Sequence, residues 1–280
     1  MTDPNARSVR QDAVADLASV DAASVWFTTD DGVRLHGLDY GSDRPPLLVL
    51  PGITSPAITM DFVATRLTDL VRPIVLDLRG RGLSDSGPSY SLRDYAADTL
   101  AVLDHFDDPL VLGHSMGARI AAVVAAKRPL RGTVLVDPPM SGPGRAPYPT
   151  TAEAFQAQLA EARAGTDAAG VARSWPRWPH REQELRARWL SSCDEAAVVE
   201  SHRSFESEDF FEFWPAVPAP TALLHGADSP VVTGQGVAEA RLTNPSATIA
   251  TVPGAGHMVF WDNPTAALAI VRSLLGDLIV

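Results

Sequence analysis

The sequence predicts an α/β protein with one mostly parallel central sheet, helices on both faces of that sheet, and a helical insertion. Three observations support this prediction. Short runs rich in Val, Leu and Ile alternate with longer segments of helical periodicity. The short runs are continuously apolar, as expected for parallel strands that are buried on both faces. The alternation stops between about residues 138 and 219 and then resumes.

The first part of the chain predicts a hairpin ahead of the parallel strands. Residues 1–23 scatter charge along their length, and we expect them to form an N-terminal arm. The segments 24–29 and 33–40 flank a turn at 30–32, which is typical of two antiparallel strands joined by a hairpin. The next predicted elements are a strand at 47–50, a helix around 60–71, a strand at 73–78 and a helix over 92–106.

The later elements continue this alternation on both sides of the insertion. They are a strand at 109–115, a helix over 116–127, a strand at 132–137, and then, after the insertion, a strand at 221–226, a helix near 235–242, a strand at 247–252 and a helix over 264–278. The insertion has helical patterns without intervening strands, and it holds four of the six tryptophans. We therefore expect a core of residues 24–139 and 220–280 and a helical cap of residues 140–219.

Composition and charge restrict the class of function. The chain of 280 residues is 45 % hydrophobic and 20 % charged, as in an ordinary soluble protein, and no apolar run is long enough to cross a bilayer. The net charge of −11 argues against non-specific binding to nucleic acid. The single cysteine, Cys193, excludes an internal disulfide, and no Cys/His cluster indicates a metal site. We expect a cytoplasmic protein acting on a small molecule, and a homo-oligomer is compatible with this composition.

The most specific motif is Gly113-His114-Ser115-Met116-Gly117, which follows a predicted strand and precedes a predicted helix. A G-x-S-x-G sequence in this context forms a strained turn that exposes the serine hydroxyl. Ser115 is therefore the candidate nucleophile, and His114 is expected to point away from the reaction. The backbone N–H groups of Met116 and of Ile53, just after Pro51-Gly52, are the expected donors to an oxyanion.

A serine hydroxyl needs a base, and His257 is the best candidate. It follows the last predicted strand in the glycine-rich loop 253–258. The other six histidines are better explained as packed or solvated side chains. The landmarks 50–52, 77–84, 113–117 and 254–257 together resemble those of the α/β-hydrolase superfamily, and the resemblance covers the chain from about residue 24. It implies the α/β-hydrolase fold and the order serine, acid, histidine along the chain.

Two aspartates compete for the place of the acid that orients His257. In most members of the superfamily this acid follows the next-to-last strand, at the third position after a glycine. Counting from Gly226, that position is Ser229, and Asp228 lies one residue too early. Asp137 ends the strand after the nucleophile helix, 22 residues beyond Ser115, and would emerge at the same edge of the sheet. We predict Asp137 as the acid, with Asp228 as the alternative.

A narrower resemblance concerns the loops that would line the site. The segments 136–145, 148–149, 50–57 and 188–190 are similar to those of the N-formylmaleamate deformylases of bacterial nicotinate degradation. This resemblance implies cofactor-free amide hydrolysis, in which N-formylmaleamate gives maleamate and formate. A carboxylate substrate needs cationic or hydroxyl partners in this acidic protein. The candidates are Arg145, Arg173 and Arg177, with the hydroxyls of Thr54 and Ser55.

Other functions share this pattern of residues. Similar caps occur in carboxylesterases, in hydrolases of acylaminomethylene-dicarboxylates, and in hydrolases that cleave C–C bonds of ring-cleavage products. A different class is a small-molecule receptor that keeps the triad only to capture its ligand. An enzyme would show many turnovers that disappear in Ser115→Ala, whereas a receptor would show slow or single turnover and a ligand-dependent partner.

Overall fold

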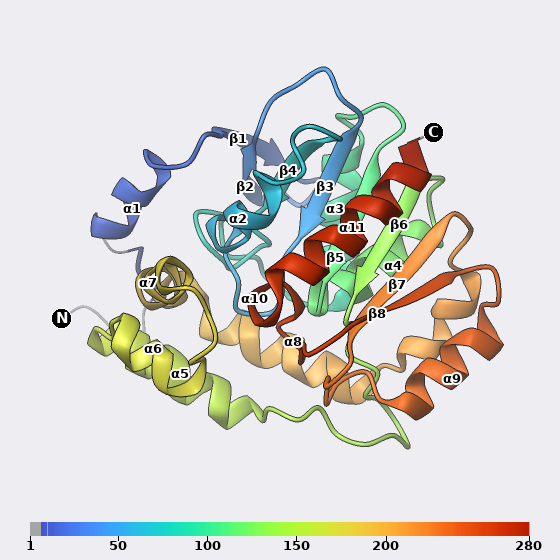
Figure 1. The fold of residues 1–280 in the computed structure, drawn as a ribbon. Coiled ribbons are helices and arrows are strands. Elements are labelled where there is room, and N and C mark those ends of the chain that lie inside the picture. Colours follow the sequence, from blue (N-terminus) through green and yellow to red (C-terminus); the bar gives the residue numbers. More distant parts are fainter. Residues whose placement is uncertain (1–6, 10, 280) are drawn as a thin grey trace.

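The computed structural model describes residues 7–9 and 11–279, and its centre is an eight-stranded sheet (Figure 1). The strands are β1 (Ala23–Thr28), β2 (Arg34–Asp39), β3 (Pro46–Leu50), β4 (Arg72–Leu76), β5 (Leu110–His114), β6 (Gly132–Val136), β7 (Thr221–Gly226) and β8 (Thr248–Val252). Their order across the sheet is β1-β2-β4-β3-β5-β6-β7-β8. The β1–β2 and β2–β4 pairs are antiparallel and the other pairs are parallel, which confirms the predicted mostly parallel sheet.

Helices cover both faces of this sheet, as predicted. They are α2 (Asp61–Ala64), α3 (Leu92–Leu103), α4 (Met116–Ala125), α9 (Gly234–Thr243), α10 (Val259–Asp262) and α11 (Pro264–Ile279). One apolar cluster joins the sheet to α3 and α4, and a second cluster joins it to α2 and α11. Since each core strand contributes side chains to both clusters, the strands are apolar at nearly every position.

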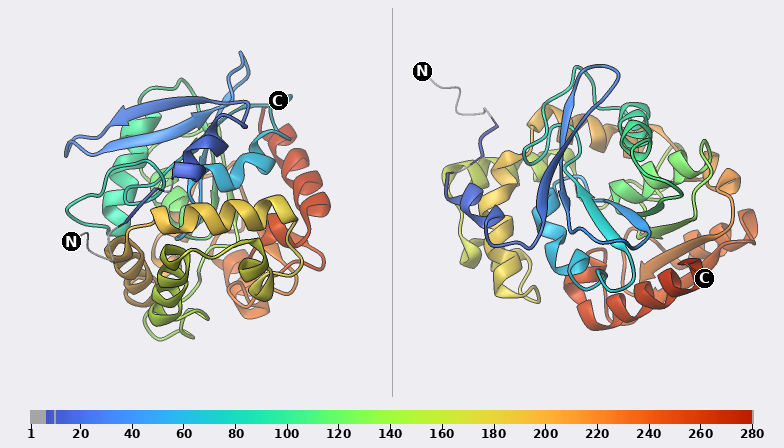
Figure 2. Two further views of the ribbon diagram at one scale, coloured as in Figure 1. Left: turned by 90° about the vertical axis from the view of Figure 1, so that its left-hand side faces the viewer. Right: turned by 90° about the horizontal axis from the view of Figure 1, so that it is seen from above.

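Between β6 and β7 the chain forms helices and no strand in the part that the structure describes. The helices are α5 (Ala152–Ala164), α6 (Ala168–Ser174), α7 (His180–Trp189) and α8 (Glu195–Ser207), with the 3₁₀ turns η2 (Leu190–Ser192), η3 (Phe210–Glu212) and η4 (Trp214–Ala216). Figure 1 and the left view of Figure 2 show α5 to α8 gathered beneath the sheet. The expected interruption of the strand–helix alternation is thus present where the sequence places it.

One predicted core helix is much shorter than expected. The segment 60–71 forms the end of the 3₁₀ helix η1 (Ala57–Met60) and the short helix α2, and continues as turns. The hydroxyls of Thr65 and Thr68 bond to the carbonyls of Asp61 and Thr65. Such side-chain bonds compete with regular helical ones, and the β-branched side chain lowers helix propensity. The other predicted core elements are present, with ends that differ by at most three residues.

The described part of the N-terminal arm packs against the insertion. Its helix α1 (Gln11–Leu17) lies beside α7 in Figure 1. The Asp16 carboxylate accepts hydrogen bonds from Arg188 Nε at 2.8 Å and from Trp189 Nε1 at 3.0 Å. Residues 1–6 and 10 of the predicted arm lie outside the described residues. Within residues 7–9 and 11–279, no helix combines the length and apolar character needed to span a membrane.

Candidate active site

Ser115 stands at the sharp turn between β5 and α4. Its φ of 55° is in the left-handed region, which a serine adopts only where the surrounding backbone requires it. Both flanking glycines are required by close backbone contacts. A Cβ atom at Gly113 would lie 2.1 Å from the Gly117 carbonyl oxygen, and one at Gly117 would lie 2.0 Å from that of Leu50. The G-x-S-x-G spacing thus permits the strained turn that the sequence predicts.

The structure brings Ser115, His257 and Asp137 together in one hydrogen-bonded chain. His257 Nε2 is 2.9 Å from Ser115 Oγ, and His257 Nδ1 is 2.7 Å from Asp137 Oδ2. The Asp137 carboxylate is fully buried, whereas His257 is partly exposed. With the Nδ1 proton donated to Asp137, the Nε2 lone pair faces the serine hydroxyl, which is the arrangement needed for a general base.

The surroundings of Asp137 explain how a carboxylate is held at this place. The Gly226 N–H donates to Oδ1 at 3.0 Å, and the Ser229 hydroxyl donates to Oδ2 at 2.6 Å. Ser229 is the residue found where most α/β hydrolases have their acid, and here its hydroxyl supports the displaced carboxylate. Asp228 is exposed, and in the described part of the chain no hydrogen bond joins its carboxylate to His257.

The predicted oxyanion donors flank the serine. Ile53 follows Gly52, where a Cβ atom would lie only 3.4 Å from that of Ser115. The loop is fixed by Arg81, whose Nε donates to the Ile53 carbonyl at 3.0 Å. Neither the Ile53 nor the Met116 amide nitrogen has a hydrogen-bond partner among residues 7–9 and 11–279. Both donors are therefore available to a ligand.

A cavity opens in front of Ser115 and His257. Its walls come from the loop after β3, the segment after β6, and helices of the insertion. The lining residues are Gly52, Ile53, Thr54, Ser55, His114, Ser115, Tyr148, Thr150, Phe155, Gln158, Trp175, Trp178, Arg186, His257 and Met258. Thr54 and Ser55 thus lie where the sequence predicts them, and they are nearly buried.

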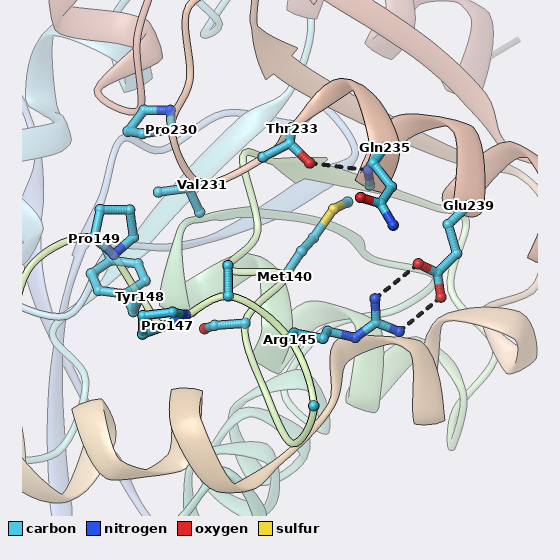
Figure 3. A pocket seen from close by; sticks show the side chains of 14 residues that line it. Met140, Arg145, Pro147, Tyr148, Pro149, Pro230, Val231, Thr233, Gln235 and Glu239 are labelled. Carbon is cyan, nitrogen blue, oxygen red and sulfur yellow. Dashed lines mark hydrogen bonds and ion pairs between the residues drawn. The ribbon is translucent and has the colours of Figure 1, made fainter.

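The three predicted arginines do not reach this cavity, which corrects the expected set of substrate ligands. Arg145 is paired with Asp209 and with both carboxylate oxygens of Glu239, and Figure 3 shows the Arg145–Glu239 pair at one side of a separate pocket. The side chain of Arg173 is 71 % exposed and binds Glu161. Arg177 lines a neighbouring pocket that His257 also borders, but it is exposed and paired with Asp262. Each of the three arginines is thus held by a carboxylate from another element, away from Ser115.

A fourth arginine, Arg186, lies in the cavity instead. It comes from α7, where the buried positions Glu182, Arg186 and Trp189 follow helical spacing. Its guanidinium donates to the Thr54 carbonyl and hydroxyl and to the Gln158 amide oxygen, and no carboxylate pairs with it among the described residues. Burial lowers the pKa of Arg186 to about 10, so the side chain is still cationic at neutral pH. The helical spacing of α7 was the signal in the sequence that could have indicated that Arg186 lies on the buried face of the helix.

His114 is buried at the border of the cavity, and its ring packs against those of His257, Phe260 and Trp261. Its ring stacks on that of His257 at 5.4 Å, and its Nε2 donates to the His257 carbonyl at 3.1 Å. Its Nδ1 is buried without a partner in the described structure. Burial, with the neighbouring His257 ring, lowers the pKa of His114 to about 4, so its ring is neutral.

This neutral histidine predicts a pH dependence of stability. The folded pKa of about 4 lies below the unfolded value of 6.5, so the unfolded chain binds the extra proton first as the pH falls. The His114 contribution is therefore present above pH 6.5 and is lost towards pH 4. Between pH 7 and pH 5 it should lower the free energy of unfolding by about 2 kcal/mol. Urea unfolding at both pH values should show a smaller loss in His114→Gln, while the exposed His180→Gln should behave as the wild type.

Comparisons with known proteins agree with this fold and this site. The model of the alpha/beta hydrolase family matches residues 47–270. The N-formylmaleamate deformylase of Pseudomonas putida is 40 % identical over 239 residues, which cover 83 % of this chain and 89 % of that protein. The 2-(acetamidomethylene)succinate hydrolase of Mesorhizobium japonicum is 29 % identical and aligns with 94 % of this chain and 99 % of its own.

Solved structures give the same result. The crystal structure of the N-formylmaleamic acid deformylase from Pseudomonas putida S16 superposes with a TM-score of 0.85 at 36 % identity, covering 89 % of this chain and all of that one. The predicted α/β-hydrolase fold and the narrower resemblance are both confirmed. The chain therefore belongs to the alpha/beta hydrolase family, and within that family it is a hydrolase related to the N-formylmaleamate deformylases.

Proposed function

We propose that this protein hydrolyses N-formylmaleamate to maleamate and formate, with Ser115 as the nucleophile. Two deformylases are among its relatives, at 40 % and 36 % identity. The observation that carries the proposal within the site is Arg186, a buried cation in the same cavity as Ser115 whose partners among residues 7–9 and 11–279 are all neutral oxygens. A buried charge without a counter-ion is costly, so a substrate carboxylate would supply the missing partner.

The recognition of the substrate follows from this charge. The carboxylate of N-formylmaleamate would pair with the Arg186 guanidinium, and the Thr54 and Ser55 hydroxyls are available in the same cavity as further donors. Such an anchor at one end of the substrate would hold the formyl group at the other end against Ser115. The insertion, residues 140–219, would then act as a cap. It contributes Arg186 and shields the ion pair between Arg186 and the substrate carboxylate from water.

Acylation would begin with proton transfer from the Ser115 hydroxyl to His257 Nε2 as Oγ attacks the formyl carbon. The oxyanion would be held by the free N–H groups of Ile53 and Met116. The Asp137 carboxylate would stabilise the imidazolium and keep its ring in place. Collapse of the intermediate breaks the C–N bond, and the Nε2 proton passes to the leaving nitrogen, which releases maleamate.

Deacylation would use the same groups in the reverse order. A water molecule gives its proton to His257 Nε2 and attacks the formyl ester of Ser115. The oxyanion forms again at the N–H groups of Ile53 and Met116. When the intermediate collapses, Ser115 Oγ takes back the proton, and formic acid leaves and loses its proton to water as formate. The wild-type enzyme should therefore release formate and maleamate in equal amounts and over many turnovers.

Arg186 provides a test of substrate recognition. We expect Arg186→Gln to raise KM for N-formylmaleamate by about 10- to 100-fold, because a charge-assisted pair is worth about 1.5–3 kcal/mol. The matched control is Arg173→Gln, at an exposed position, which should keep the wild-type KM. Formate release, measured with formate dehydrogenase, gives both constants. An equal KM in the two variants would contradict the role of Arg186. If the wild type released acetate from 2-(acetamidomethylene)succinate but no formate from N-formylmaleamate, the first compound would replace the second as the proposed substrate.

A further inference from the structure

Tyr148 is a buried tyrosine whose hydroxyl lies beside both reacting atoms of the Ser115–His257 pair. The hydroxyl oxygen is 3.2 Å from His257 Nε2, the same atom that lies 2.9 Å from Ser115 Oγ. Nε2 is the atom that takes the serine proton and returns it to the leaving group. Tyr148 is thus placed beside the atom that a leaving group must approach.

The position of this hydroxyl is set by packing. Tyr148 is only 6 % exposed, and its ring lies against Phe205 and Phe155 at centroid distances of 5.0 and 6.3 Å. Its backbone N–H donates to Glu206 Oε1 at 2.8 Å, which ties the loop after β6 to α8. Since the ring is enclosed by aromatic neighbours and the backbone is anchored, the hydroxyl is held at the reacting atoms.

The hydrogen-bonding capacity of the Tyr148 hydroxyl follows from its protonation. Burial raises the pKa of Tyr148 above the ordinary value, so the hydroxyl is neutral at pH 7 and carries one donor and two acceptor lone pairs. Neutral His257 has a single acceptor at Nε2, which the Ser115 hydroxyl occupies at 2.9 Å. Since that acceptor is taken, Nε2 needs no proton from the tyrosine, and the lone pairs of the tyrosine oxygen stay available to a ligand.

We propose that Tyr148 accepts a hydrogen bond from the N–H of the scissile amide and makes this site selective for amides over esters, an inference that rests on the proposed function. The tyrosine oxygen and Nε2 are 3.2 Å apart, so one nitrogen atom can lie within hydrogen-bonding distance of both. The leaving nitrogen has to approach Nε2 to receive its proton. In that place its N–H points to Tyr148 and its lone pair points to His257.

The chemical benefit arises when the tetrahedral intermediate collapses. The bond between the formyl carbon and nitrogen breaks, its electron pair goes to nitrogen, and the Nε2 proton passes to that nitrogen while Tyr148 keeps its own proton. The nitrogen lone pair is delocalised in the amide and becomes available only in the intermediate. Fixing the N–H direction therefore fixes the direction from which protonation occurs. The leaving oxygen of an ester has no hydrogen to donate, so Tyr148 offers it no such contact.

The test compares two substrates that form the same formyl-enzyme on Ser115. N-formylmaleamate has an N–H leaving group, whereas 4-nitrophenyl formate releases a phenolate that needs no proton. We expect Tyr148→Phe to lower kcat/KM for the amide by about 10- to 100-fold and for the ester by less than about threefold. The ratio of the two constants should fall at least about tenfold. Ser115→Ala supplies the blank for spontaneous hydrolysis of the ester.

Tyr90→Phe is the matched control, because its hydroxyl binds Asp194 and its side chain does not line the cavity. It should leave the amide-to-ester ratio at the wild-type value. An equal loss of kcat/KM for both substrates in Tyr148→Phe would mean a structural role and would overturn the inference. No loss for either substrate would overturn it as well. Failure of the wild type to release formate from N-formylmaleamate, with ester hydrolysis intact, would overturn the proposed function itself and is recognised before any tyrosine variant is measured.

Discussion

Replacing Ser115 with alanine is expected to lower kcat for formate release by about 10⁴- to 10⁶-fold. The variant keeps the cavity, the free N–H groups and the buried arginine, so it should still bind N-formylmaleamate with a dissociation constant close to that of the wild type. It cannot form the formyl-enzyme, which requires a covalent bond to Oγ. Formate release together with calorimetric binding of the substrate checks both parts of this prediction.

The chain contains its own control for this experiment. Ser24 Oγ lies 3.0 Å from His36 Nε2, and His36 Nδ1 lies 2.7 Å from Asp77 Oδ2, so the three residues copy the order of a catalytic triad. Ser24 is exposed in the regular strand β1, without a strained turn or a helix N-terminus behind it. Ser24→Ala should keep wild-type turnover, and a fluorophosphonate probe should label the wild type and Ser24→Ala but not Ser115→Ala. Labelling of Ser115→Ala would contradict the assignment of the nucleophile.

This pair of serines shows why the fold and part of the site could be predicted. Hydrogen bonds among Ser, His and Asp arise wherever such residues pack together, whereas a nucleophile also needs a particular backbone. The glycines beside Ser115 are visible in the sequence, because a side chain at either position would clash with backbone. The strands were predictable for a similar reason, since burial on both faces leaves a continuous apolar run. Both the glycines of a strained turn and the apolar run of a buried strand can therefore be recognised from a few neighbouring residues.

The substrate ligands depend on how distant elements dock, and short segments do not show this. Arg145 and Arg186 carry the same guanidinium group. The fold pairs Arg145 with Glu239, 94 residues away, and gives Arg186 no carboxylate partner in the part of the chain that the structure describes. Tyr148 belongs to the segment 148–149 that resembles the deformylases, but the sequence does not show that its hydroxyl reaches His257, 109 residues later in the chain. Asp137 was predictable because the ends of parallel strands share one edge of the sheet.

Replacing Asp137 with asparagine is expected to lower kcat by about 10³- to 10⁴-fold. The amide would present its NH₂ group or a neutral oxygen to His257 Nδ1, so the ring would lose both its preferred tautomer and the charge that stabilises the imidazolium. The matched control is Asp228→Asn, which should keep kcat within about threefold of the wild type because its carboxylate is exposed. Steady-state formate release distinguishes the two, and near-normal turnover in Asp137→Asn would contradict the assignment of the acid.

Ser229 allows a stricter form of this test. Its hydroxyl lies 2.6 Å from the Asp137 oxygen that contacts His257, so a carboxylate at position 229 can reach the same space. We expect the double variant Asp137→Asn with Ser229→Asp to recover at least about tenfold in kcat over Asp137→Asn alone, because a charge returns to Nδ1. Ser229→Asp by itself should be slow, since two buried carboxylates would share one site and repel each other. If activity returns in the double variant but not in Ser229→Asp, a carboxylate next to His257 Nδ1 is sufficient for the role of the acid. The strand that carries this carboxylate then does not matter.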